Sequence, residues 1–176
     1  MRLEDFIKEL KELPDERLHE ERGVGDNFII RLKADYGLLC DFLENTGHVS
    51  TDKEKSKYGT KVYYEQTGLV YMQVSEVEDC FFDSVYTDAH PKLKREVEGK
   101  YNCCIMFHPS REGNKKGVEL KTDRAMTETI IKVGEYVLKN NLGAWIPSCY
   151  GPSVGCMEKG ENWILSRMAF HPPVDF

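Results

Sequence analysis

The stretch that decides the predicted fold runs from Lys116 to Asn141 and reads KGVELKTDRAMTETIIKVGEYVLKNN. Apolar and charged residues alternate from Val118 to Lys121, which is the period of a strand with one buried face. Asp123 follows in the position of a helix N-cap. Apolar residues then recur at the spacing of an amphipathic helix, at Met126, Ile130, Val133 and Val137. The stretch therefore predicts a strand, a cap and a helix of about four turns that packs back on its sheet.

A second unit of the same kind is predicted nearer the start of the chain. Asn27–Lys33 alternates like a strand, and Asp35 is placed to cap the helix that follows. Two strands joined by a tight turn are expected after this helix, at 61–66 and 69–75. An amphipathic helix with apolar residues from Leu3 to Leu10 precedes the whole unit.

The two units share a sequence pattern as well as an order of elements. IRLKAD at 30–35 resembles VELKTD at 118–123, and each is followed by a predicted helix. In the second unit, the helix is followed by predicted strands at 144–149 and 162–170. Between the units we expect a strand at 80–86, a helix at 90–97 and a strand at 101–108. These similarities raise the hypothesis of a duplicated strand-helix-strand-strand unit.

The element order predicts an α+β fold with a mainly antiparallel sheet and helices packed on one face, because hairpins outnumber crossovers. No stretch is long enough for a linker, so we expect a single domain, 1–176, with an N-terminal helical segment (1–24) and an α+β core (27–170). This layout resembles the gyrase-inhibitor-like ligand-binding domains, in which two such units form a cleft for small organic molecules. The resemblance rests on element order and carries over no site residue.

Composition and charge restrict the possible functions. Of the 176 residues, 40% are apolar and 31% are charged, as in globular proteins. The net charge of −6 and the scattered basic residues argue against general nucleic-acid binding. We expect no signal peptide and no membrane partner, because no apolar run reaches the roughly 20 residues of a membrane helix. The six cysteines lack the spacing of a disulfide framework, which indicates reduced thiols and a cytoplasmic location.

Aromatic residues on the predicted strands suggest a ligand site. Tyr64, Tyr71, Trp145 and Trp163 can line an apolar cleft with hydroxyl and indole groups, and Glu119 would be its polar anchor. The same residues also fit an ordinary core with cross-strand contacts. The leading hypothesis is a domain that binds a small molecule or peptide in this cleft, without a cofactor, a metal or a catalytic motif.

Two enzymatic alternatives rest on other residues. Glu119 and Lys121 on a strand would be half of the motif of divalent-metal nucleases and phosphodiesterases, in which the carboxylate binds the metal. The predicted neighbouring strand has no acidic residue at its start to complete this motif. The stretch CYGPSVGC at 149–156 could supply two metal-binding thiols, or a nucleophile at Cys149 for a thiol enzyme. A glycine-rich loop with two partly buried cysteines explains the same stretch.

Two further hypotheses concern histidines and a protein partner. His108 and His171 each precede a proline at a strand end, which proline chemistry alone explains. They could act together if their strands are neighbours. The last alternative is a protein–protein interaction factor without a pocket, which would bind its partner through the apolar stripe of the N-terminal helix.

Overall fold

The computed structural model describes residues 1–14, 28–46, 49–50, 61–76, 91–109, 119–147 and 168–176. The helices in these residues are α1 (Leu3–Glu12), α3 (Tyr36–Asn45), α5 (Pro91–Val97) and α6 (Glu119–Asn140). The strands are β1 (Phe28–Lys33), β2 (Val49–Ser50), β3 (Lys61–Tyr64), β4 (Val70–Glu76), β5 (Cys103–Pro109), β6 (Gly143–Pro147) and β7 (Met168–His171). They form one sheet in the order β2-β3-β4-β5-β1-β6-β7, with antiparallel neighbours throughout. The predicted α+β class with an antiparallel sheet is confirmed.

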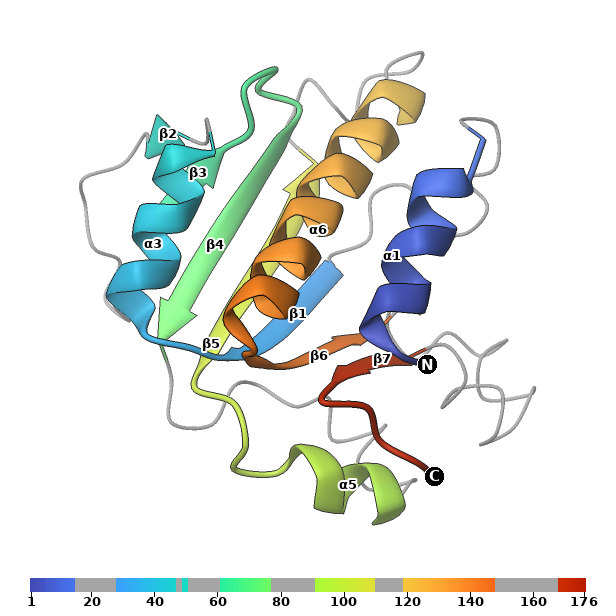
Figure 1. Ribbon diagram of the computed structural model, residues 1–176. Coiled ribbons are helices and arrows are strands. Elements are labelled where there is room, and N and C mark those ends of the chain that lie inside the picture. The colour runs from blue at the N-terminus through green and yellow to red at the C-terminus, as the bar shows by residue number, and fades with distance from the viewer. Residues whose placement is uncertain (15–27, 47–48, 51–60, 77–90, 110–118, 148–167) are drawn as a thin grey trace.

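The three longer helices, α1, α3 and α6, lie on one face of the sheet (Figure 1). Their apolar sides and the strand residues beneath them form one buried core. In the central strand β1, Ile30 and Leu32 are fully buried in this core, whereas Arg31 between them points to the opposite face. The stripe expected on α6 is buried in the same core, at Met126, Ile130, Val133 and Val137. The prediction of helices on one face is therefore confirmed for the long helices.

The short helix α5 packs on the opposite face of the sheet. Leu93 and Val97 of α5 are fully buried in a second cluster with Trp145, Met168 and Phe170. These strand residues alternate with Ala144, Ile146 and Ala169, which belong to the first core. The sheet is therefore buried on both faces at the end that contains β6 and β7.

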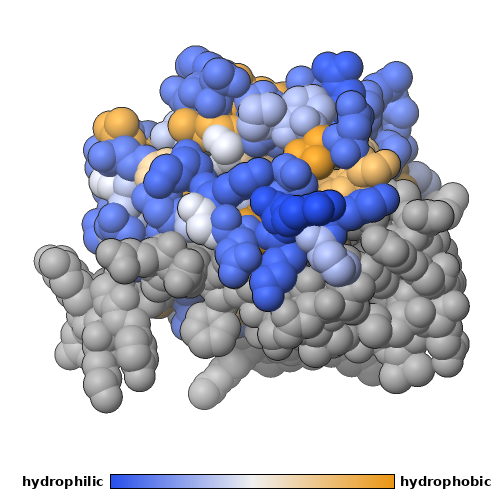
Figure 2. All heavy atoms as spheres, turned by 90° about the horizontal axis from the view of Figure 1, so that it is seen from below, coloured by the Kyte–Doolittle hydropathy of each residue, from blue (hydrophilic) through white to orange (hydrophobic). Residues whose placement is uncertain are grey.

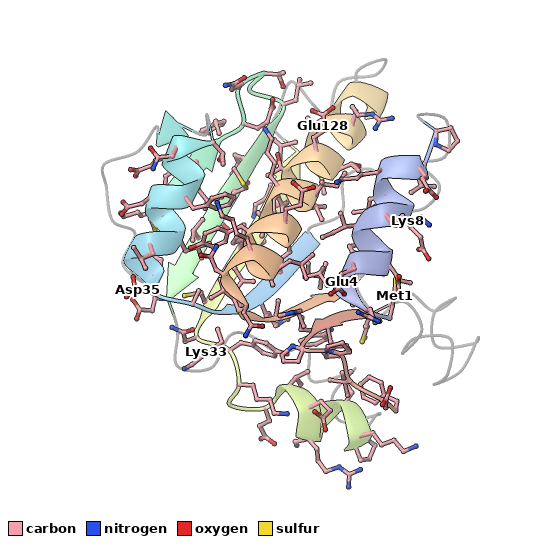
Figure 3. The ribbon with its side chains drawn as sticks, viewed as in Figure 1. Met1, Glu4, Lys8, Lys33, Asp35 and Glu128 are labelled. Carbon is pink, nitrogen blue, oxygen red and sulfur yellow. The ribbon has the colours of Figure 1, made fainter. Side chains whose placement is uncertain are left out.

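Most elements predicted from the sequence are present within the described residues. The strand and capped helix of the first unit are β1 and α3, and the tight hairpin after them is β3 and β4. Asp35 lies between β1 and α3 (Figure 3), and its Oδ1 accepts a hydrogen bond from Leu38 N at 2.9 Å. The predicted helix at 90–97 is α5, and the predicted strand at 101–108 is β5. The predicted strand at 80–86 lies outside the described residues.

The strand predicted at Val118–Lys121 is wrong. Helix α6 already begins at Glu119, and among the described residues the strand that precedes α6 is β5. Alternation over four residues is too short to identify a strand, and Glu, Leu and Lys are all good helix formers. The similar sequences at 30–35 and 118–123 therefore belong to different elements, the first to the end of β1 and the second to the start of α6. Their similarity does not mark equivalent strands.

Two strand-helix-strand-strand segments can nevertheless be traced through the sheet. They are β1-α3-β3-β4, with the two-residue β2 inserted, and β5-α6-β6-β7. Their first strands, β1 and β5, pair with each other at the centre of the sheet. The last two strands of each segment join the central pair in different ways. In the first segment the later strand, β4, borders β5, whereas in the second segment the earlier strand, β6, borders β1. The element order of the two segments is thus alike, and their strand order is not.

Helix α1 is held on α6 and on the edge of the sheet. Its apolar stripe is buried in the first core, and Lys11 forms an ion pair with Glu135 of α6 at 2.5 Å. The amino group of Met1 donates to Met168 O at 2.9 Å, and Phe170 N donates to Met1 O at 3.1 Å. The stripe that one alternative assigned to a protein partner is therefore buried in the first core.

In the view from below, hydrophilic residues cover most of the described surface, and hydrophobic residues form small separate patches (Figure 2). Within the described parts of the chain, no helix has the length and apolar character needed to cross a membrane.

Candidate functional site

The candidate site lies on the face of the sheet opposite the three long helices. The strand register places its side chains in rows that run across the strands. The aromatic row consists of Tyr64 on β3, Tyr71 on β4 and His108 on β5. The middle row beside it consists of Val62, Gln73, Met106 and Ile29. The third row consists of Ser75, Cys104, Arg31, Trp145 and Phe170, and it leads to the cluster under α5.

The rings of the aromatic row are in contact along its length. Tyr71 and His108 are stacked, with ring centroids 4.6 Å apart and planes 12° apart. Tyr64 and Tyr71 are tilted by 35°, with centroids 5.8 Å apart. All three side chains are half-buried, whereas the residues next to them on the same strands, Tyr63, Val70 and Phe107, are fully buried in the first core. The row is thus a continuous aromatic surface on a rigid strand scaffold.

His108 is held in one orientation by two neighbours. Its Nε2 lies 3.1 Å from Oε1 of Gln73, and its ring is stacked on Tyr71. An amide oxygen can only accept, so Nε2 carries the hydrogen and Nδ1 carries the lone pair of the neutral ring. Burial lowers the pKa of His108 below its ordinary value, which favours this neutral form at pH 7.

Three polar atoms of the aromatic row have no hydrogen-bond partner among the described residues. They are Nδ1 of His108 and the phenol oxygens of Tyr64 and Tyr71, and all three side chains are half-buried. The row therefore combines apolar ring surface with one acceptor and two hydroxyl groups, which can donate or accept. This combination is typical of sites for small organic molecules.

The aromatic and middle rows contain no charged side chain. The first charge on this face is Arg31 in the third row, which is 4% exposed and lies 4.4 Å from the ring centroid of Trp145. The described part of this surface is therefore polar and aromatic rather than ionic.

The structure brings two of the predicted site residues together and separates a third from them. Tyr64 and Tyr71 are cross-strand partners in the aromatic row. Trp145 is on the same face, but β5 and β1 lie between its strand and β4. It is 1% exposed and stacks on Phe170, with centroids 6.3 Å apart. Trp163 lies outside the described residues.

The residues of the metal-nuclease hypothesis do not lie on a strand. Glu119 and Lys121 are in the first turn of α6, so the strand context of the half-motif is missing. Within the described ranges, no group of three or more histidine, cysteine or acidic side chains could hold a metal ion. Asp79, Asp83 and Asp88, which precede the predicted neighbouring strand in the sequence, lie outside those ranges.

The structure describes three thiols, and one of them, Cys103, is a poor nucleophile. Cys40 and Cys103 are buried and Cys104 is half-buried, and all three are free. Burial raises the pKa of Cys103 to about 12, so this thiol stays protonated at neutral pH. Cys149 and Cys156 lie outside the described residues, and the thiol-enzyme hypothesis stays untested there.

His108 and His171 do not meet. β1 and β6 lie between the strands of His108 and His171. The Nδ1 of His171 lies 2.7 Å from the carbonyl oxygen of Leu142, which fixes this ring at the far side of the sheet. His108 is therefore the histidine of the candidate site, without His171.

Sequence reasoning did not connect His108 and Gln73 with the tyrosines. Alternation within β4 places Tyr71 and Gln73 on one face, and this could have been predicted. The pairing of β4 with β5 sets His108 opposite Tyr71, and no local signal gives that register.

Comparisons with known proteins do not assign this site. The chain matched no protein-family model, no curated protein and no solved structure.

Proposed function

We propose that this domain binds a small planar organic molecule on the aromatic row of Tyr64, Tyr71 and His108. The observation that carries the proposal is the half-buried stack of Tyr71 on His108, in a row whose polar atoms include three without a hydrogen-bond partner among the described residues. A planar ligand can extend such a stack, and each aromatic contact contributes about 0.5–1.5 kcal/mol beyond the burial of area. Rigid strands hold the rings in place, so binding costs little ordering of the protein.

The element order of the chain supports the same proposal. The segments β1-α3-β3-β4 and β5-α6-β6-β7 follow the strand-helix-strand-strand order of the gyrase-inhibitor-like ligand-binding domains. This likeness concerns layout alone, so the residues of the aromatic row carry the functional argument. We include a cytoplasmic location in the proposal, because the three described cysteines are free thiols.

A matched pair of tyrosine variants tests the proposal. Tyr71 and Tyr136 are both half-buried, and each is stacked on another ring. Tyr136 is stacked on Phe42, with ring centroids 4.0 Å apart and planes 13° apart. Tyr136 belongs to α6, on the helical side of the sheet. Tyr71→Ala should weaken binding about tenfold through the loss of stacking and buried area, and Tyr136→Ala should leave it unchanged.

The assay is a panel of bicyclic ring compounds screened by NMR against the full chain. Binding should shift the aromatic resonances of Tyr64, Tyr71 and His108, and a titration gives the Kd for each variant. Equal Kd values for the two variants, or a panel in which no compound binds, would contradict the proposal.

A further inference from the structure

We infer that the ligand of the aromatic row is an uncharged heteroaromatic molecule that donates a ring N–H to Nδ1 of His108, with Gln73 as the residue that positions this acceptor. The inference rests on the proposed function, and it adds the chemical class of the ligand. Two features of the sheet carry it: the contacts that orient His108, and the absence of charge in the rows around it.

The orientation of His108 decides which polar group a ligand must supply. The Gln73 amide oxygen accepts from Nε2, so Nδ1 can only accept. The two nitrogens flank Cε1 of the imidazole ring, and their in-plane hydrogen-bonding directions diverge, so the lone pair of Nδ1 points away from Gln73. Stacking on Tyr71 prevents the ring from turning out of this plane. A ligand that presents a carbonyl or an ether oxygen to Nδ1 meets a second lone pair, whereas an N–H completes a hydrogen bond.

The charge pattern of the described rows favours one class of ligand. The aromatic and middle rows have no lysine or arginine to bind a carboxylate or phosphate, and no acidic residue to bind an ammonium group. Arg31 is on the same face, but it is almost fully buried against Trp145. Placing an unpaired ionic group on this surface costs desolvation without compensation. The described surface therefore favours a neutral ring over a nucleotide or an aromatic acid.

Four probes with one ring system separate these properties. Indole has the N–H and no charge, 1-methylindole lacks the N–H, indole-3-acetate is an anion and tryptamine is a cation. We expect indole to bind the full chain about fivefold more tightly than 1-methylindole, which corresponds to one hydrogen bond. Indole-3-acetate and tryptamine should bind no more tightly than indole. The readout is the Kd from NMR titration at pH 7.5.

Variants test whether Gln73 positions the acceptor. Gln73→Leu should abolish the preference for indole, so that the Kd values of indole and 1-methylindole become about equal, because no residue then fixes the imidazole tautomer. Ser75→Ala, on the same strand and face but in the third row, should keep the full preference. His108→Phe keeps a ring in the row without an acceptor, and it should also abolish the preference.

The outcomes separate this inference from the proposed function. Equal binding of indole and 1-methylindole to the unmodified chain would overturn the inference and leave the proposed function standing. Tighter binding of either charged probe would overturn the assignment to uncharged ligands. If the preference for indole persists in both Gln73→Leu and His108→Phe, another group accepts the hydrogen bond from the indole N–H, and the inference is wrong. If none of the four probes binds, the proposed function fails together with the inference.

Discussion

The close approach of α1 to α6 gives a sharp prediction at Gly134. A Cβ at this position would lie 2.7 Å from Cδ1 and 3.0 Å from Cγ1 of Ile7, and 3.7 Å from Cδ1 of Leu3. The first of these distances is too short for two carbon atoms, so Gly134→Ala must displace Ile7 within a buried contact. Gly134 is in the interior of α6, where glycine is otherwise unfavourable.

Two opposing effects set the size of the change. Alanine gains about 1 kcal/mol over glycine in a helix interior, and overpacking of a core costs about 1–3 kcal/mol. We therefore expect Gly134→Ala to lower the free energy of unfolding by about 1 kcal/mol. In the background of Ile7→Val, which removes Cδ1, the same change should be neutral or stabilising by up to about 1 kcal/mol. Ile7→Val alone should cost about 1 kcal/mol.

The assay is a double-mutant cycle from urea unfolding of the four proteins. The reasoning predicts that the cost of Gly134→Ala depends on residue 7, because the two side chains are in contact. The same cost in both backgrounds, within about 0.4 kcal/mol, would refute the packing of α1 on α6 through these two residues.

Two further predictions concern Asp35 and His108. Asp35→Ala removes the acceptor for Leu38 N and should lower the free energy of unfolding by about 1 kcal/mol, whereas Asp35→Asn should retain most of this stability. If urea unfolding gives the same loss of stability for both variants, Asp35 does not act as a cap. Burial lowers the pKa of His108 from 6.5, so the unfolded chain takes up this proton at a higher pH than the folded chain. Stability should therefore fall as the pH drops below about 6.5, and His108→Gln should lack this component. An NMR titration of His108 with a midpoint at or above 6.5 would contradict the assigned burial.

The parts of the fold that depend on local pattern could be predicted from the sequence. Phe28–Lys33 alternates over six residues, and the capping residue Asp35 follows two residues after its end. The predictions of β1 and of the start of α3 are therefore both confirmed. The amphipathic spacing from Met126 to Val137 likewise identified the core side of α6. The start of α6 could not be predicted, because the residues at 118–121 satisfy a short strand pattern and a helix equally well.

The candidate site depends on which strands pair and in which register, and for β4 and β5 this could not be predicted from the sequence. Tyr64 and Tyr71 could be proposed as partners because a tight hairpin joins their strands. His108 comes from a strand more than thirty residues further on, and only the antiparallel pairing of β4 with β5 sets it on Tyr71. Trp145 was a reasonable candidate as an aromatic residue on a strand. Its burial in the cluster under α5 depends on tertiary packing that strand alternation does not encode.

The central claim is that a planar ligand contacts the aromatic row itself. The most direct measurement is a set of intermolecular NOEs between bound indole and the side chains of a full chain labelled with carbon-13 in its aromatic rings. We predict NOEs from indole to the ring protons of Tyr64, Tyr71 and His108, and none to Trp145 or Tyr136. NOEs confined to Trp145 or Tyr136, with none to the aromatic row, would contradict the account.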